Sequence, residues 1–172
     1  MLRRIMLFAV VLAVAVTAVP AKATVIPLFA TLDGAQEAPP VPTPGFGAAA
    51  LLFDTDTNLL VWSIVFGGLL APTTVSHFHN GLPGVSGPVV LDINVGAPGF
   101  SSPLFGDATL TAGQAAQLLA GNWYINIHTT LNPGGEIRGQ VTVIPEPATV
   151  TLLGLGSALL FASRRLRRKF SA

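Results

Sequence analysis

Residues 48–66 read AAALLFDTDTNLLVWSIVF, and this stretch predicts a β-hairpin. Two runs rich in apolar and β-branched residues, 48–53 and 58–66, have the length of strands and flank a polar turn at 54–58. The turn begins like a calcium-binding loop, but Leu59 occupies the sixth position, where such a loop needs glycine for its sharp bend. We therefore interpret residues 54–58 as a turn between antiparallel strands.

Similar runs, separated by turn residues, continue on both sides of this hairpin. One helix is predicted among them, because Thr111 and Gln114 can form a capping box and Gly121 can supply a left-handed exit. We expect an all-β domain, either a β-sandwich or a flattened barrel, of about eight antiparallel strands with one short helix. The predicted strands are Val25–Leu32, Ala48–Phe53, Asn58–Phe66, Thr74–His79, Val89–Asn94, Asp107–Leu110, Tyr124–His128 and Glu136–Val143.

Charge is distributed unevenly along the 172 residues. Of the nine lysines and arginines, three lie before residue 24, five lie after residue 163, and only Arg138 lies between. Seven carboxylates accompany it, so residues 24–143 carry a formal net charge of −6 with histidine neutral. A nucleic-acid-binding protein needs a basic surface, which this segment lacks. The absence of cysteine excludes a disulfide framework and a thiolate metal site.

The first residues have the parts of a secretory signal peptide. Arg3 and Arg4 precede a predominantly apolar run, 5–19, and an Ala-x-Ala site follows at 21–23. A buried core helix is the alternative, but such a helix would show a polar face, which this run lacks. We predict that residues 1–23 are a signal peptide and that signal peptidase cleaves between Ala23 and Thr24.

Residues 144–172 have the order of a C-terminal sorting segment. Pro145, Glu146 and Pro147 interrupt regular structure, residues 148–163 are apolar or small, and residues 164–169 include five basic side chains. A helix over 148–163 would span about 24 Å, slightly less than the roughly 30 Å hydrocarbon core, and flanking arginines can snorkel across the difference. We expect a transmembrane helix in the inner membrane with its basic tail in the cytoplasm. A plain tail anchor is the alternative.

This C-terminal pattern resembles the bacterial PEP-CTERM sorting signal, whose signature is carried by Pro145, Glu146 and Pro147. The resemblance implies that an exosortase-type membrane protease cuts near the motif, in a Gram-negative host that makes extracellular polysaccharide. It also implies an exported protein that is first tethered in the inner membrane and then reaches the periplasm, the cell surface or the exterior.

The central segment, 24–143, contains three ordered stretches: FATLDGAQEAPPV at 29–41, HFHNG at 77–81 with GPVV at 87–90, and YINIH at 124–128 with NPGGEIRGQ at 132–140. Together they resemble the CHRD domain, and the likeness extends from about residue 28 to residue 143. The resemblance implies an extracytoplasmic β domain with no established enzymatic activity. We therefore expect a non-catalytic binding or structural role in the cell envelope or extracellular matrix, with extracellular polysaccharide or a matrix protein as partner.

The three histidines of the chain indicate a metal site as the alternative. Residues i and i+2 of a strand share a face, so His77 and His79 point the same way and Phe78 points to the other side. His128 ends another predicted strand. If the two strands adjoin, three imidazoles converge and leave an open position on a zinc or copper ion. The competing interpretation is that these imidazoles only hydrogen-bond loops to the sheet.

A fainter likeness to copper-zinc superoxide dismutase is carried by His77, His79, His128 and Arg138. It implies a similar sandwich and a role in metal capture or redox chemistry. The chain departs from that family, because it has no fourth histidine to bridge two metals and no cysteine pair to brace the loops.

Arg138, as the one cation of the central segment, is expected to form a structural, bidentate ion pair with Glu37 or Glu136. Nucleophilic catalysis is not expected, because no serine lies in a Gly-x-Ser-x-Gly elbow. A polysaccharide hydrolase would need two carboxylates that meet across a groove, and no spacing in the sequence selects such a pair.

Overall fold

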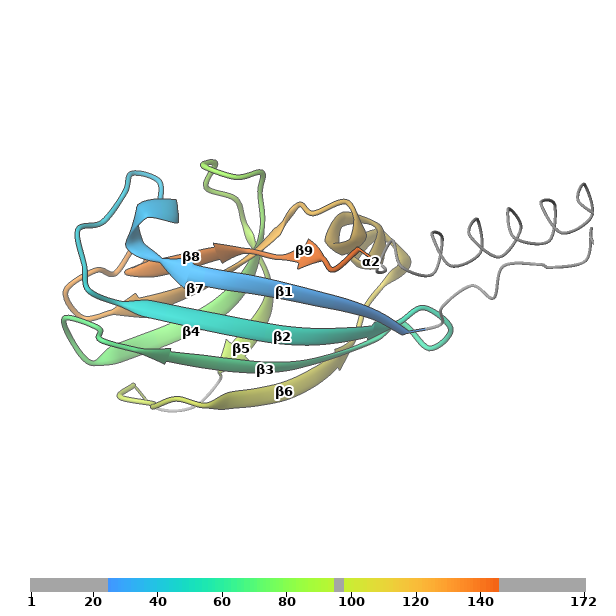
Figure 1. Ribbon diagram of the computed structural model, residues 1–172, viewed down its shortest axis with the longest axis horizontal. Coiled ribbons are helices and arrows are strands. Elements are labelled where there is room, and N and C mark those ends of the chain that lie inside the picture. The colour runs from blue at the N-terminus through green and yellow to red at the C-terminus, as the bar shows by residue number, and fades with distance from the viewer. Residues whose placement is uncertain (1–24, 95–97, 146–172) are drawn as a thin grey trace, which may run out of the picture.

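The computed structural model describes residues 25–94 and 98–145, which form an all-β domain with one short α-helix (Figure 1). A single 3-10 turn, η1, covers Gly34–Gln36. The remaining elements are β1 Val25–Asp33, β2 Phe46–Asp54, β3 Leu59–Gly67, β4 Thr73–Asn80, β5 Val89–Asn94, β6 Leu104–Thr109, α2 Ala112–Leu119, β7 Trp123–Thr129, β8 Ile137–Gln140 and β9 Thr142–Val143.

The strands form one antiparallel sheet in the order β5-β4-β7-β8-β1-β2-β3-β6, and the short β9 pairs with β1. The sheet curves until its two edge strands, β5 and β6, approach each other, so the architecture is a nearly closed barrel. Figure 1 shows β1, β2, β3 and β6 side by side across the front of the molecule. The expected all-β fold with one helix is confirmed, and the sheet is continuous as in a flattened barrel.

The hairpin predicted at 48–66 is present as β2 and β3, which pair from Phe46 with Gly67 to Asp54 with Leu59. The Asp54 carboxylate accepts main-chain N–H bonds from Asp56 at 2.8 Å and Thr57 at 3.2 Å, and these bonds lower the pKa of Asp54. The loop is therefore held by bonds from its main chain to the Asp54 side chain, as expected of a turn.

The core lies inside the curved sheet, where alternate residues of each strand point. The helix α2 contributes Leu118, which is fully buried. Its start is fixed by the predicted capping box between Thr111 and Gln114, and Gly121 just after it adopts a φ of 75°. The largest fully buried apolar side chains of this core are Leu28, Leu32, Leu51, Phe53, Leu60, Ile64, Phe78, Leu118, Trp123, Ile125 and Ile127.

Each of the eight predicted strands is found, with ends that differ by up to three residues. The predicted strand Glu136–Val143 is divided, because Val141 donates its N–H to the Trp123 carbonyl of β7 at 2.9 Å and the chain then pairs with β1 as β9. The predicted signal peptide, its Ala23–Thr24 cleavage site, and residues 146–172 with Glu146, Pro147 and the expected transmembrane helix lie outside the described residues. No helix within 25–94 and 98–145 is long and apolar enough to cross a membrane.

The packing of β6 against β3 makes a test of the core. A β-carbon on Gly106 would lie 2.5 Å from Cζ2 of the buried Trp62, whereas one on Gly113 of α2 meets no atom within 4 Å. We expect Gly106→Ala to lower the free energy of unfolding by about 1–3 kcal/mol through overpacking. Gly113→Ala should raise it by about 0.4–1 kcal/mol, because alanine favours the helix. Chemical denaturation measures both, and an unchanged Gly106→Ala variant would show that Trp62 packs elsewhere.

Candidate metal centre

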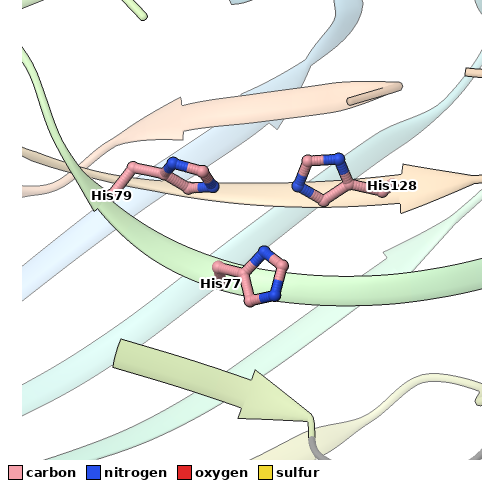
Figure 2. A group of neighbouring side chains, drawn as sticks. All are labelled: His77, His79 and His128. Carbon is pink, nitrogen blue, oxygen red and sulfur yellow. The ribbon is translucent and has the colours of Figure 1, made fainter. Parts of the chain in front are cut away.

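Two adjacent strands bring the three histidines together. β4 carries His77 and His79, β7 carries His128, and the two strands pair in antiparallel register with His77 opposite Asn126. The three imidazoles lie on one face of the sheet, as Figure 2 shows, while Phe78 on the other face is fully buried in the core. The condition set by the sequence, that the two strands adjoin, is therefore met.

The three rings surround a common point. Their centroids are 5.3 Å apart for His77 and His128, 5.6 Å for His77 and His79, and 5.9 Å for His79 and His128. One nitrogen from each ring lies within 4.8 Å of the others. Three nitrogens around one tetrahedral zinc ion would be about 3.4 Å apart, so shared ligation requires the rings to move inward from this arrangement.

Main-chain carbonyl groups fix two of the rings. The Nδ1 atom of His79 lies 2.9 Å from the Gly87 carbonyl oxygen, and Nδ1 of His128 lies 2.9 Å from the Pro133 carbonyl oxygen. A carbonyl can only accept, so each Nδ1 carries the proton and each Nε2 keeps a lone pair. Both Nε2 atoms are buried and have no hydrogen-bond partner among the described residues. Such hydrogen bonds to the far nitrogen are the usual support of a metal-binding histidine.

A carboxylate holds the third ring. Nε2 of His77 lies 3.5 Å from Oδ1 of Asp92 on β5. The other ring nitrogen of His77, Nδ1, is buried and has no hydrogen-bond partner in the described part of the chain. With 18% of its side chain exposed, His77 is also the most accessible of the three, since His79 and His128 are 8% and 7% exposed as residues. The open side of the cluster therefore lies toward β5.

Burial keeps the three imidazoles neutral. Loss of solvent lowers the pKa of His77, His79 and His128 below the ordinary value of 6.5. The neighbouring imidazoles act in the same direction, whereas the carbonyl bonds of His79 and His128 and the Asp92 carboxylate beside His77 oppose the shift. Neutral imidazole is the form that binds metal.

The ring of Tyr124 stacks on the ring of His79. The ring of Tyr124 lies parallel to that of His79, with centroids 4.9 Å apart and planes at 9°, and the Arg138 guanidinium lies 3.4 Å from the Tyr124 centroid on β7. The Tyr124 hydroxyl accepts the Gly87 N–H at 3.0 Å, so one loop residue holds both rings. Sequence reasoning missed Tyr124, Gly87, Pro133 and Asp92 as supports, because loop conformation decides which of them reach the histidines.

The predicted ion pair of Arg138 is not formed. The buried guanidinium donates to the carbonyl oxygens of Val85 at 3.1 Å and Leu82 at 2.9 Å, and no carboxylate oxygen of the described residues lies within salt-bridge distance. Glu136 is engaged elsewhere, although it is also buried. It accepts bonds from the Thr43 hydroxyl, the Leu70 N–H and the Thr129 hydroxyl, each at 2.7 Å.

Glu37 interacts with Arg138 only through longer-range attraction. Burial raises the pKa of Glu37 to about 7, while the charge of Arg138 and a weak hydrogen bond from Asn126 act in the opposite direction. Its Oε1 atom is buried without a hydrogen-bond partner among the described residues. The carboxyl is therefore partly protonated near neutral pH.

Replacement of Arg138 tests its structural role. Arg138→Leu would remove the donor to the Val85 and Leu82 carbonyls and the cover of Tyr124, so we expect a loss of about 2–4 kcal/mol in the free energy of unfolding. Arg138→Lys keeps the charge but not the planar fork, and should lose less. A loss below about 0.5 kcal/mol for Arg138→Leu, measured by chemical denaturation, would contradict this role.

Replacement of Glu37 tests the raised pKa. A raised pKa means that the folded chain takes up the proton more readily, so the contribution of Glu37 to stability is present below its ordinary value of 4.5 and is lost as pH rises through about 7. Glu37→Gln cannot titrate. We expect the stability of this variant relative to the parent to increase from about pH 5 to about pH 8 in chemical denaturation. A relative stability that stays constant or decreases would show that Glu37 is ionised throughout.

Comparison with protein families identifies both the domain and the C-terminal signal. A family model for the CHRD domain matches residues 28–141, and a model for the PEP-CTERM protein-sorting motif matches residues 143–169. Neither the comparison with curated proteins nor that with solved structures finds a match. The sorting motif implies export, a membrane-associated intermediate and processing by exosortase. Because the first match covers most of the chain, the protein belongs to the CHRD domain family.

Proposed function

We propose that this exported domain binds one transition-metal ion, zinc or copper, through His77, His79 and His128. The observation that carries the proposal is a set of three buried ring nitrogens, one from each histidine, which lie together and have no hydrogen-bond partner among the described residues. Buried polar atoms are nearly always paired, because an unpaired one loses its hydration without compensation. A bound cation would satisfy all three.

The donor set selects the class of metal. Imidazole nitrogen suits zinc and copper, whereas calcium and magnesium prefer oxygen ligands. The cluster offers three neutral nitrogens and no thiolate, because the chain contains no cysteine. Three protein ligands leave one position for water or another small ligand, on the side where His77 is exposed. With three histidines in the whole chain, a second metal bridged by imidazole has no ligands left.

The rest of the chain supplies orientation. The carbonyls of Gly87 and Pro133 fix the proton positions of His79 and His128, and the Asp92 carboxylate lies 3.5 Å from Nε2 of His77. The competing interpretation, that the imidazoles fasten loops to the sheet, explains only the nitrogens that contact these groups. It does not explain why the opposite nitrogen of each ring is buried beside the other two.

The role we propose is metal capture outside the cytoplasm rather than catalysis. We infer a domain at 24–143, between a signal peptide at 1–23 and a sorting segment at 144–172. The sorting motif supports a destination in the cell envelope or extracellular matrix, where extracellular polysaccharide or a matrix protein would be the neighbour.

Metal titration of the chelator-treated chain tests the proposal. We expect one equivalent of Zn(II) or Cu(II) to bind and to raise the melting temperature by about 10 °C when free metal exceeds the dissociation constant a hundredfold. The shift should persist somewhat below pH 6.5, because burial lowers the pKa of all three ligands.

Variants separate the ligands from their support. His77→Ala/His79→Ala should lose the shift, and Asp92→Asn should weaken binding about 10- to 100-fold by removing the support of His77. Asp107→Ala, an exposed carboxylate on β6 away from the cluster, is the matched control and should bind as the parent does. If neither metal shifts the melting temperature of the parent chain, the proposal is wrong.

A further inference from the structure

The outer surface of β1, β2, β3 and β6 carries large apolar side chains on all four strands. Large apolar side chains on it are exposed, at fractions that range from 42% for Val61 to 70% for Phe105. Antiparallel sheets with one face in water normally alternate apolar and polar residues, whereas these strands place large apolar residues on both faces. We call this surface the apolar sheet face; its large members are Val25, Phe29, Phe46, Leu52, Val61, Val65 and Phe105.

On the opposite half of the barrel, loops cover the outer face of the sheet. The outward side chains of β7 and β8, including Tyr124, Asn126, His128 and Arg138, are buried. Loop residues such as Leu82, Val85 and Pro133 contact them there. No comparable loop of the described residues lies over the apolar sheet face, whose side chains remain exposed. Contiguous exposed apolar surface of this kind marks an interaction site.

The chemistry of the face restricts its partner. It contains no lysine or arginine, and its carboxylates Asp33, Asp54 and Asp107 lie at strand ends or on the edge strand. An anionic lipid surface would therefore find no attraction. The few hydroxyl groups on the face also give little to a polysaccharide, which needs many hydrogen bonds. The complementary partner is another flat apolar surface.

A second copy of the chain offers such a surface with a matching relief. Residues that lie opposite one another across β1, β2, β3 and β6 form rows. In one row the bulky side chains belong to the outer strands, β1 and β6, and in the next row they belong to the inner strands, β2 and β3. Two copies related by a two-fold axis can therefore place the inner bulky residues of one over the inner small residues of the other. The first row is Phe29, Ala50, Ser63 and Phe105, and the second is Pro27, Leu52, Val61 and Asp107.

The size of the face is comparable to that of a specific protein interface. Four strands spaced about 4.8 Å apart, with up to nine residues at about 3.4 Å each, give a footprint of roughly 500 Å². Projecting side chains raise the accessible area toward the about 800 Å² per partner that specific interfaces bury. Sheets that pack face to face in this way align their strands within about 30°.

From the composition, relief and size of this surface, we propose that the chain forms a symmetric dimer by packing its apolar sheet face against the same face of a second copy. The metal cluster lies on the other half of the barrel, in β4 and β7, so each copy keeps its own site accessible from the β5 side. The dimer does not depend on the proposed metal binding.

The chain contains no cysteine, so a single introduced thiol reports on the face. In cells that export the full chain, Ser63→Cys on β3 should be joined to a second copy by a short homobifunctional maleimide. Gly113→Cys, at an exposed position of α2, is the control and should remain monomeric under the same conditions. Adding Leu52→Lys and Val65→Lys to Ser63→Cys should reduce cross-linking at least tenfold. These exposed substitutions should leave the melting temperature close to that of the parent.

Two results would overturn the dimer. In the first, Ser63→Cys is not cross-linked and reacts with a monofunctional maleimide as fast as Gly113→Cys, which shows a bare face. In the second, Ser63→Cys is protected from the reagent but is not joined to another copy, which shows a different occupant. Failure of the metal titration would leave this test unaffected, because it probes the other half of the barrel.

Discussion

The pairing of β4 with β7 is the constraint on which the rest of the structure depends. It places His77 and His79 beside His128 on one face and sends Phe78 and Ile127 into the core on the other. A slip of one residue would exchange these two sets, because side chains alternate along a strand. The imidazoles would then enter the core and the apolar side chains would leave it. The hydrophobic core therefore holds the register that assembles the histidine cluster.

Loop carbonyls hold the side chains that the strands bring together. The segment after β4 supplies the Gly87 carbonyl to His79 and the Leu82 and Val85 carbonyls to Arg138, while the segment after β7 supplies the Pro133 carbonyl to His128. Each of these contacts satisfies a buried polar atom on the outer side of the sheet. One nitrogen of each of the three rings remains without a partner among the described residues, and their shared position is what a cation would use. A polar outer face is thus buried on one half of the barrel, and an apolar outer face is exposed on the other.

The sequence predicted the parts that depend on local periodicity and turn chemistry. All eight strand positions, the capping box at Thr111 and the common face of His77 and His79 follow from spacing alone. The hydrogen-bond partners of Arg138 could not be predicted, because they are main-chain carbonyls of a loop and every residue type has such a carbonyl. The support of His79 by Tyr124 likewise depends on the cross-strand pairing of the two residues. The last predicted strand is divided because the chain changes its pairing strand at Val141, and the periodicity of apolar residues does not show such a change.

The central claim is that burial keeps His79 and His128 neutral and that loop carbonyls hold the proton on Nδ1, which leaves the lone pair of Nε2 free for a metal. Long-range proton–nitrogen correlation NMR of the metal-free chain near pH 7 measures this directly, because the shifts of the two ring nitrogens identify the tautomer. Our account predicts the Nδ1–H tautomer for both residues, with the Nε2 resonances moving when Zn(II) is added. Protonated rings, or the Nε2–H tautomer in either residue, would contradict it.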